Sequence, residues 1–280
     1  MIRNTTGAGI RAYELLLWMK KIAAFLVLFL FMAAPALAGP PFLTDDPVPV
    51  PLGHYEFYVF STLDKARDGT TVQAPAFEFN AGIFPETQFH LVLPFTAALP
   101  KEGPGAFGPG DIETGIKYRF MRETKNRPQA GIFPMIELPS GSASRGLGNG
   151  RAEEKIPVWL QKSFGPWTTY GGMGYEINQA PDGRNYLFGG WLLQRDLSEK
   201  LTLGAEVFAL GRTAEDEQAT AIFNFGGYYN FTRNFSLLFT AGHSFLGARH
   251  LVGYLGLYWT GAIKAHAIHP ALPLKTRPCL

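Results

Sequence analysis

The sequence predicts an all-β protein: a transmembrane antiparallel up-and-down β-barrel of about twelve strands, preceded by an N-terminal signal peptide. Three observations lead to this fold class. Charged residues make up only 17% of the 280 residues, whereas ordinary soluble domains carry about 25%. Polar and apolar side chains alternate through one segment after another, and the connections between these segments alternate between long and short. A chain whose outer surface faces lipid has this composition and this pattern.

The N-terminus has the composition of a secretory signal peptide. Lys20 and Lys21 precede an unbroken apolar run, and small residues follow that run up to Ala38. The run is shorter than the ~20 residues of a membrane-spanning helix, but it fits the apolar core of a signal peptide. We therefore assign residues 1–38 to the signal-peptide region, with Met19 as the expected true start and cleavage after Ala38. The alternative is an uncleaved N-terminal anchor.

The charge and the cysteine content exclude two classes of protein. The first 38 residues carry a net charge of +3 while the whole chain carries +2, so the remainder carries −1. No basic stripe or cluster follows, and nucleic acid is not an expected partner. Cys279 is the only cysteine, so no disulfide can form within the chain. An exported protein without disulfides fits a membrane barrel better than a small disulfide-stapled domain.

Period-two alternation begins at Gly53 and is clearest over 110–120. There Glu113 and Lys117 alternate with residues such as Ile116. Successive side chains of a strand point to opposite faces, so this pattern predicts a strand with one polar and one apolar face. Twelve such segments are predicted, near residues 53–63, 74–84, 87–94, 110–120, 128–138, 154–163, 168–177, 185–195, 201–210, 220–230, 235–243 and 251–259. The sixth, eighth and twelfth are largely apolar on both faces, which leaves their inward side unassigned.

The connections between the predicted strands differ in length in a regular way. The long ones are 64–73, 95–109, 139–153, 178–184, 211–219 and 244–250, and the short ones are 85–86, 121–127, 165–167, 196–200 and 231–234. Outer-membrane barrels have short periplasmic turns and long external loops. An even strand number then places both termini in the periplasm. We expect residues 39–52 to be a periplasmic segment, 53–259 the barrel and 260–280 an irregular C-terminal tail.

The inward faces of the predicted strands carry polar side chains of both signs. The lumen-lining candidates are Glu56, Glu78, His90, Asp111, Glu113, Lys117, Arg119, Glu206 and Asn224. Two interpretations are open. Neighbouring charges pair and satisfy one another inside the barrel, or they line a solute pathway. Because both signs are present, no strong preference for anions or cations is expected.

No motif predicts a catalytic residue, a metal ligand or a cofactor. The glycine-rich stretch 140–150 lacks the strand-to-helix context and the Gly-Lys-Ser/Thr ending of a phosphate-binding loop, so we expect an exposed, flexible loop. His243 and Ser244 resemble the pair of a barrel-embedded lipid hydrolase, but adjacent strand residues point to opposite faces. The acidic pair at 45–46 either binds a divalent ion or forms a solvated turn. The six histidines are too scattered to form a metal site.

Several stretches of the sequence resemble those of one known protein family. They are Gly-Pro-Pro-Phe-Leu-Thr-Asp-Asp-Pro at 39–47, Gly-His-Tyr-Glu-Phe at 53–57, and the stretches 110–120, 131–139, 144–150, 157–167 and 190–196. Over about 39–259 the chain resembles the outer-membrane proteins grouped under "meta-pathway of phenol degradation". The resemblance implies a transporter-like barrel, sometimes encoded beside aromatic-degradation genes, and it assigns no binding residue. Barrels of this kind usually end on an aromatic residue, whereas about twenty residues follow Trp259 here.

These observations lead to three alternative functions for a protein of the bacterial outer membrane. The first is a channel that passes small apolar or aromatic solutes, which rests on the architecture and the resemblance. The second is a plugged structural or surface-interaction barrel without transport. The third, less favoured, is a barrel-embedded lipid hydrolase, and we expect no enzyme. The expected partners are outer-membrane lipids, the outer-membrane assembly machinery and a small aromatic solute.

Overall fold

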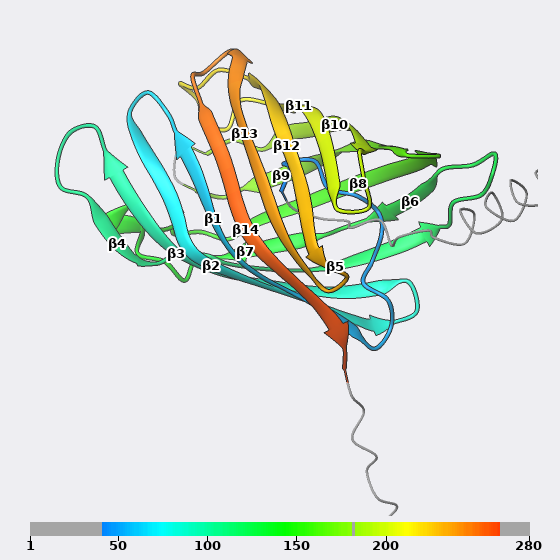
Figure 1. Cartoon of the computed structure of the whole chain (residues 1–280). Helices are drawn as coiled ribbons and strands as arrows, with labels where there is room; N and C mark the ends of the chain where they lie inside the picture. The colour runs from blue at the N-terminus through cyan, green and yellow to red at the C-terminus, as the bar shows by residue number, and fades with distance from the viewer. Residues whose placement is uncertain (1–40, 181–182, 264–280) are drawn as a thin grey trace, which may run out of the picture. The chain divides into compact units, whose positions relative to one another are not determined.

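The computed structural model describes residues 41–180 and 183–263. In this part of the chain, fourteen strands form one antiparallel sheet that closes into a barrel (Figure 1). The strands are β1 (His54–Lys65), β2 (Gly69–Phe84), β3 (Thr87–Pro100), β4 (Ala106–Pro109), β5 (Ile112–Met121), β6 (Gln129–Ile132), β7 (Met135–Leu138), β8 (Glu153–Phe164), β9 (Trp167–Asn178), β10 (Tyr186–Asp196), β11 (Leu201–Leu210), β12 (Thr220–Thr232), β13 (Phe235–Leu246) and β14 (Leu251–Ala262).

The fourteen strands form twelve spans, because two of the spans are each divided into two strands. β4 and β5 both pair with β3, so they are successive halves of one span. β6 and β7 both pair with β5 and with β8, and they are separated at Phe133-Pro134. Proline has no backbone N–H to donate to the ladder, which explains why the strand breaks there. The prediction of an antiparallel barrel of about twelve strands is confirmed.

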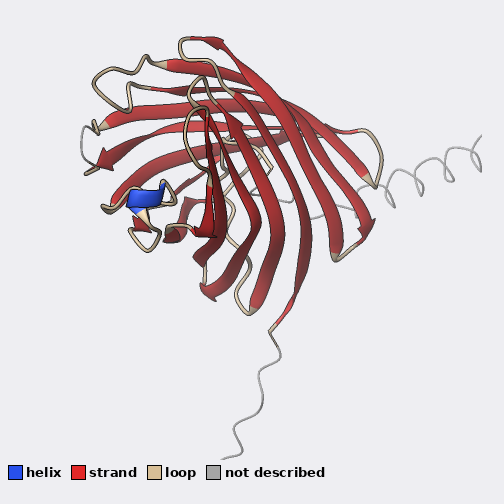
Figure 2. Cartoon of the chain, turned by 90° about the vertical axis from the view of Figure 1, so that its left-hand side faces the viewer, coloured by secondary structure: helices blue, strands red, loops and turns tan. Residues whose placement is uncertain are grey.

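The barrel is closed by pairing between the first and the last strand. β1 pairs with β14 along its whole length, from His54 opposite Ala262 to Lys65 opposite Leu251. Figure 2 shows the strands as a continuous tilted wall around the interior. Closure matters because lipid offers no hydrogen-bond partner to an exposed sheet edge.

Side chains alternate between the interior and the outer surface as the sequence pattern predicts. In β5, Lys117 is 3% exposed while its neighbour Tyr118 is 46% exposed. In β11, Glu206 is 1% exposed and Val207 is 45% exposed. The exposed large side chains of the strands are overwhelmingly Leu, Ile, Val, Phe, Tyr and Trp. An apolar outer surface with polar side chains inside is the arrangement of an outer-membrane barrel.

Strands extend into three of the predicted long loops, and in 95–109 β3 runs to Pro100 and β4 occupies Ala106–Pro109. β1 and β2 extend until only residues 66–68 connect them, and β13 and β14 leave only 247–250. The predictions of loops at 64–73, 95–109 and 244–250 were therefore too long. The hairpins continue the backbone ladder toward their tips, where the hydrophobic pattern that marks a strand in the sequence has faded. The connection 139–152 is the longest, and it contains a short 3₁₀ helix at Ala143–Arg145.

Aromatic rings stack on the outer surface beside the short turns. The ring of Phe231 lies 5.2 Å from that of Phe235, which lies 5.0 Å from Trp259, which in turn lies 6.2 Å from Phe57. Aromatic side chains at such positions are typical of the membrane–water interface. Tyr258, the neighbour of Trp259, faces inward and is 2% exposed.

Several expectations fall outside the described residues. These are the signal peptide and its cleavage site at residues 1–38, and the C-terminal tail beyond residue 263. β14 extends to Ala262, slightly past the predicted barrel end at 259. Among the described residues, no helix has the length and hydropathy needed to cross a membrane.

The outward assignment of Ile116 in β5 gives the first prediction. Ile116→Arg places a charge on the lipid-facing surface, which should lower the free energy of unfolding by roughly 2–4 kcal/mol. We expect much less of the compact, heat-modifiable form on gels of the outer-membrane fraction. Ile116→Leu is the control and should assemble normally. Normal assembly of Ile116→Arg would mean that the faces of β5 are reversed.

Gly115, the inward-facing neighbour of Ile116, is not a suitable position for a control substitution to arginine. A Cβ atom there would lie 2.7 Å from the Cγ of Met135 and from the carbonyl oxygen of Pro134. The glycine is required by the close approach of β7, whatever the polarity of the lumen.

Candidate functional site

The structure places eight of the nine candidate residues on the inward faces of strands, and Asp111 in the connection between β4 and β5. Glu78, His90, Asp111, Lys117, Glu206 and Asn224 are buried, and Glu56, Glu113 and Arg119 are partly buried. They do not form one site. Seven of them fall into three groups: a network around His90, the contacts of an N-terminal segment, and an anchor for the longest loop. Of the other two, Glu56 accepts hydrogen bonds from the hydroxyls of Tyr58 and Tyr258, and Arg119 lies apart.

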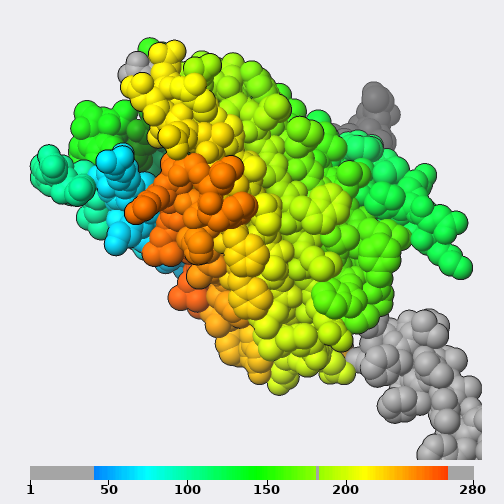
Figure 3. All heavy atoms as spheres, turned by 90° about the horizontal axis from the view of Figure 1, so that it is seen from above, coloured from blue at the N-terminus to red at the C-terminus, as the bar shows by residue number. Residues whose placement is uncertain are grey.

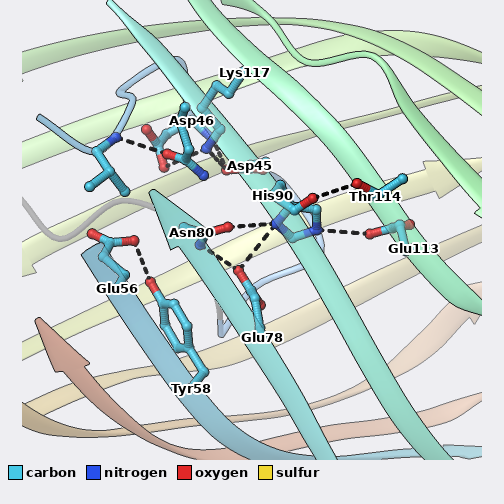
Figure 4. A network of polar contacts seen from close by, with 12 residues as sticks. Asp45, Asp46, Glu56, Tyr58, Glu78, Asn80, His90, Glu113, Thr114 and Lys117 are labelled. Atoms are coloured by element: carbon cyan, nitrogen blue, oxygen red, sulfur yellow. Dashed lines mark hydrogen bonds and ion pairs between the residues drawn. The ribbon is translucent and has the colours of Figure 1, made fainter. Parts of the chain in front are cut away.

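The first group is a polar network on β2, β3 and β5 (Figure 4), which continues to Lys155 on β8. The His90 ring contacts Asn80 Oδ1 through Nδ1 at 2.7 Å and Glu113 Oε1 through Nε2 at 3.2 Å. Asn80 donates to Glu78 Oε1 at 2.8 Å. Lys155 Nζ donates to the second oxygen of Glu113 at 2.9 Å. Buried polar groups need such partners, and most of this network satisfies itself.

The second group holds residues 41–52, which lie inside the barrel. The backbone N–H groups of Leu43 and Thr44 donate to the carboxylate of Glu206. Lys117 Nζ lies 2.9 Å from Asp45 Oδ1. Thr240 Oγ1 donates to the carbonyl oxygen of Pro41 at 2.9 Å. The expectation that residues 39–52 form a periplasmic segment is thus wrong for 41–52, because inward-facing groups of β5, β11 and β13 bind them within the barrel.

Glycines on the inner face of the barrel wall leave space for this segment, because they have no side chain. A Cβ atom at Gly204 would lie 3.2 Å from the ring of Phe42, and one at Gly131 would lie 3.1 Å from the Cβ of Pro47. The segment therefore crosses the inner faces of β11 and β6. Its acidic pair is no solvated turn, since Asp46 is completely buried. In the described part of the chain, no group of three or more His, Cys, Asp or Glu side chains could hold a metal ion.

Glu206 anchors the segment together with Asn224. Asn224 donates to Glu206 Oε2 at 2.8 Å, and both side chains are almost fully buried. A buried carboxylate is stable when charge-assisted hydrogen bonds satisfy it, as the backbone N–H groups and the amide do here. The sequence identified both residues as inward-facing, but it could not identify their partner.

The third group anchors the longest loop, 139–152. Asp111 accepts hydrogen bonds from the backbone N–H groups of Gly141 at 2.7 Å and Asn149 at 2.6 Å. Leu147 is 2% exposed and packs against the inward side of Gly108. The loop at 140–150 is largely exposed, as expected, but Asp111 and the buried Leu147 fix part of it to the lumen side of the wall.

An aromatic cluster lies beside these polar groups inside the barrel. It consists of Phe133, Trp159, Phe188 and Phe208, all at most 8% exposed. Lys117 Nζ lies 4.8 Å from the centre of the Phe133 ring, so this ring forms the boundary with the polar network. The sequence analysis missed the cluster. The signal was present, because the predicted strands at 154–163 and 185–195 were apolar on both faces.

A cavity of about 650 Å³ opens at the long-loop end of the barrel. It lies between the hairpins β1–β2 and β3–β4 and the Ser144–Gly146 turn of the longest loop. In Figure 3 the surface is hollowed beside the blue-to-cyan hairpin β1–β2. Its lining includes Asp64, Asp68, Glu102, Arg145, Leu99 and Pro100. We call this cavity the vestibule.

The remaining candidate, Arg119, lies at the short-turn end. Its Nε donates to Glu86 Oε2 at 2.5 Å, and a terminal nitrogen donates to Gln129 Oε1 at 2.8 Å. The hydrogen bond from Arg119 holds the pKa of the Glu86 carboxyl, in the β2–β3 turn, below its usual value. Arg119 is thus committed to this turn and does not face open lumen.

His243 and Ser244 do not form a catalytic pair. The His243 ring contacts the backbone carbonyl of Ser244, whereas the Ser244 hydroxyl accepts from the backbone N–H of His250. His250 in turn contacts Asp64 at 2.9 Å. A nucleophilic serine needs a base within reach of its hydroxyl, and the structure places neither imidazole in hydrogen-bond contact with it.

The ion pair between Lys117 and Asp45 gives the second prediction. Lys117→Met removes the positive charge that holds the acidic segment in the lumen, so the segment should bind less firmly. We expect a larger single-channel conductance in planar bilayers. Lys125→Met, the same change in an exposed turn, should leave the conductance unchanged. An unaltered conductance in Lys117→Met would show that this pair does not hold the segment.

The third prediction concerns the anchor of the loop. Asp111→Ala removes the acceptor of two backbone N–H groups, which should release residues 139–152. Protease added to intact cells should then cut this loop faster than in the original protein. Asp216→Ala, in the exposed loop 211–219, is the control and should leave the cleavage rate at 139–152 unchanged. Equal rates in both variants would contradict the anchoring role.

Solved structures of low sequence identity share the fold. The COG4313 outer-membrane channel from Pseudomonas putida F1 superposes with a TM-score of 0.63 at 13% identity, over 80% of this chain and 100% of that chain. The translocator domain of the autotransporter NalP from Neisseria meningitidis gives a TM-score of 0.51 at 12% identity, over 73% of this chain and 88% of that one. Both are similar in architecture, and at this identity the similarity extends to the fold alone.

A comparison with curated protein sequences finds no match. A family model does match, and it covers residues 52–259, from two residues before β1 to three residues before the end of β14. The matched region includes Glu206, Lys117 and Asp111, the residues that anchor the inner segment and the longest loop. The chain therefore belongs to the family described as "Putative MetA-pathway of phenol degradation".

Proposed function

We propose that this barrel is a channel through the bacterial outer membrane for small apolar or aromatic solutes. The observation that carries the proposal is the aromatic cluster of Phe133, Trp159, Phe188 and Phe208 on the lumen side of the wall. A barrel interior that only had to satisfy its own polar groups has no need of such a surface, since the lumen of a membrane barrel is ordinarily polar. An apolar surface inside the wall offers an apolar solute a place out of water.

The Trp159 side chain adds a polar feature to this surface. It is 2% exposed, and its Nε1–H has no hydrogen-bond partner among the described residues. An unpaired buried donor is costly unless something occupies it for part of the time. Apolar walls with a few unpaired polar groups are typical of sites for small molecules.

The vestibule is a second feature that supports the proposal. It is open to the outside at the long-loop end, and its volume lies within the range of small-molecule sites, about 300–1,000 Å³. Its wall combines apolar residues such as Leu99 with carboxylates such as Asp64. A solute would pass the vestibule first and then the polar network before it reaches the aromatic cluster.

A plugged barrel without transport is the second candidate, and one observation favours it. Residues 41–52 fill part of the lumen, held by Glu206, Lys117 and Thr240. A channel requires that this segment leaves a path beside it or moves. The two candidates differ in one measurable property, the passage of an apolar solute across an intact outer membrane.

The fourth prediction tests this passage with N-phenyl-1-naphthylamine, an apolar aromatic dye that fluoresces inside membranes. Cells that express the barrel should take it up faster than cells that do not. Trp159→Gln, which replaces the inner aromatic surface with an amide, should slow this uptake several-fold. The control is Trp191→Gln, because Trp191 lies two strands away on β10, is 56% exposed and faces outward.

Each result leads to one conclusion. Faster uptake that depends on Trp159 but not on Trp191 supports a channel. Uptake no faster than in cells without the barrel contradicts the channel and leaves the plugged barrel. Heat-modifiable mobility of each variant must first show that it is folded.

A further inference from the structure

We infer that the lumen selects its solutes by charge, admitting cationic aromatic solutes and rejecting anionic ones. The inference rests on the proposed function and adds the class of solute to it. It departs from the expectation that the mixed signs of the lumen residues cancel. In the structure a row of glutamates on β5, β7 and β8 has fewer basic side chains beside it than carboxylates.

A row of three glutamates crosses the inner wall below the vestibule. Glu113 on β5 lies directly opposite Glu137 on β7, and Glu137 lies directly opposite Glu153 on β8. Directly opposed like charges on neighbouring strands destabilise a sheet. Glutamine at these positions would line the lumen without that cost, so the fold by itself does not explain the row.

Basic side chains neutralise only part of this row. Lys155 Nζ lies 2.9 Å from Glu113 and 3.7 Å from Glu137. Within the described residues, no basic group comes within ion-pair distance of Glu153 or of Glu176 on β9. Lys155 lies opposite Glu176 in the strand register, but its side chain turns to Glu113 and Glu137 instead.

The vestibule has the same sign as the row. Asp64, Asp68 and Glu102 line it, and Arg145 is its one basic lining residue. Arg145 donates to the backbone carbonyl of Phe107 at 3.0 Å and keeps its charge, so the lining has three carboxylates to one guanidinium. A solute that enters from outside therefore meets carboxylates first.

The other inward-facing cations are committed elsewhere. Lys117 pairs with Asp45 of the inner segment, and Arg119 pairs with Glu86 at the short-turn end. The glutamate row is thus left with fewer cations than carboxylates. A cleft of one sign with low-dielectric walls focuses the field and raises the local concentration of ions of opposite sign by about 10- to 1,000-fold.

The test uses two aromatic ions of similar size and permanent charge, benzyltrimethylammonium and benzenesulfonate. The purified full-length barrel is reconstituted into liposomes, which neither ion crosses readily by itself. We expect benzyltrimethylammonium to enter at least about tenfold faster than benzenesulfonate. In planar bilayers with a KCl gradient, the reversal potential should have the sign of K⁺ selectivity.

A matched pair of substitutions assigns the selectivity to the glutamate row. Glu137→Gln combined with Glu153→Gln keeps the shape of both side chains and removes both carboxylates. The ratio of cation flux to anion flux should therefore fall toward one, and the reversal potential should move toward zero. Glu154→Gln is the control. It makes the same change one residue along β8, on the opposite face of the strand, and should leave the ratio unchanged.

The outcomes separate this inference from the proposed function. Equal fluxes of the two ions, or a faster anion, together with dye uptake by cells that express the original protein, overturn charge selection and leave the channel. A ratio that the double substitution does not change overturns the role of the glutamate row. No dye uptake and no flux of either ion overturn both proposals.

Discussion

The closure of the sheet between β1 and β14 is the constraint on which the rest of this structure depends. A backbone N–H or C=O group left unpaired in lipid costs several kcal/mol, so a strand wall in a membrane has to be continuous. Once the wall is closed, the alternation of each strand divides its side chains between lipid and lumen. Every polar side chain that faces inward must then find a partner within the barrel.

The N-terminal segment meets part of this requirement. Its backbone N–H groups satisfy the Glu206 carboxylate, and its Asp45 pairs with Lys117. The longest loop does the same for Asp111 from the other end of the barrel. The lumen is therefore filled from two directions by segments whose own hydrogen-bond donors complement the wall. Such filling is expected for a barrel too wide for its side chains to occupy alone.

The parts of the lumen that are not satisfied in this way are where function is to be sought. The aromatic cluster has an indole N–H without a hydrogen-bond partner in the described part of the chain, and the glutamate row has more carboxylates than Lys155 can pair with. Both features cost stability, and neither is required for closure. An apolar surface combined with an unbalanced negative charge fits a pathway for apolar solutes that carry no negative charge, which connects the two proposals made above.

The sequence by itself determined the wall of this barrel. Alternation of period two depends only on neighbouring residues, so the inward side of Lys117 and the outward side of Ile116 could be assigned from the chain alone. Only the tertiary structure decided what fills the lumen. Thr44 and Glu206 lie 162 positions apart, and Asp111 binds Asn149 across 38 positions. No local pattern encodes such pairs, because they exist only after the closed sheet has brought distant strands around a common interior.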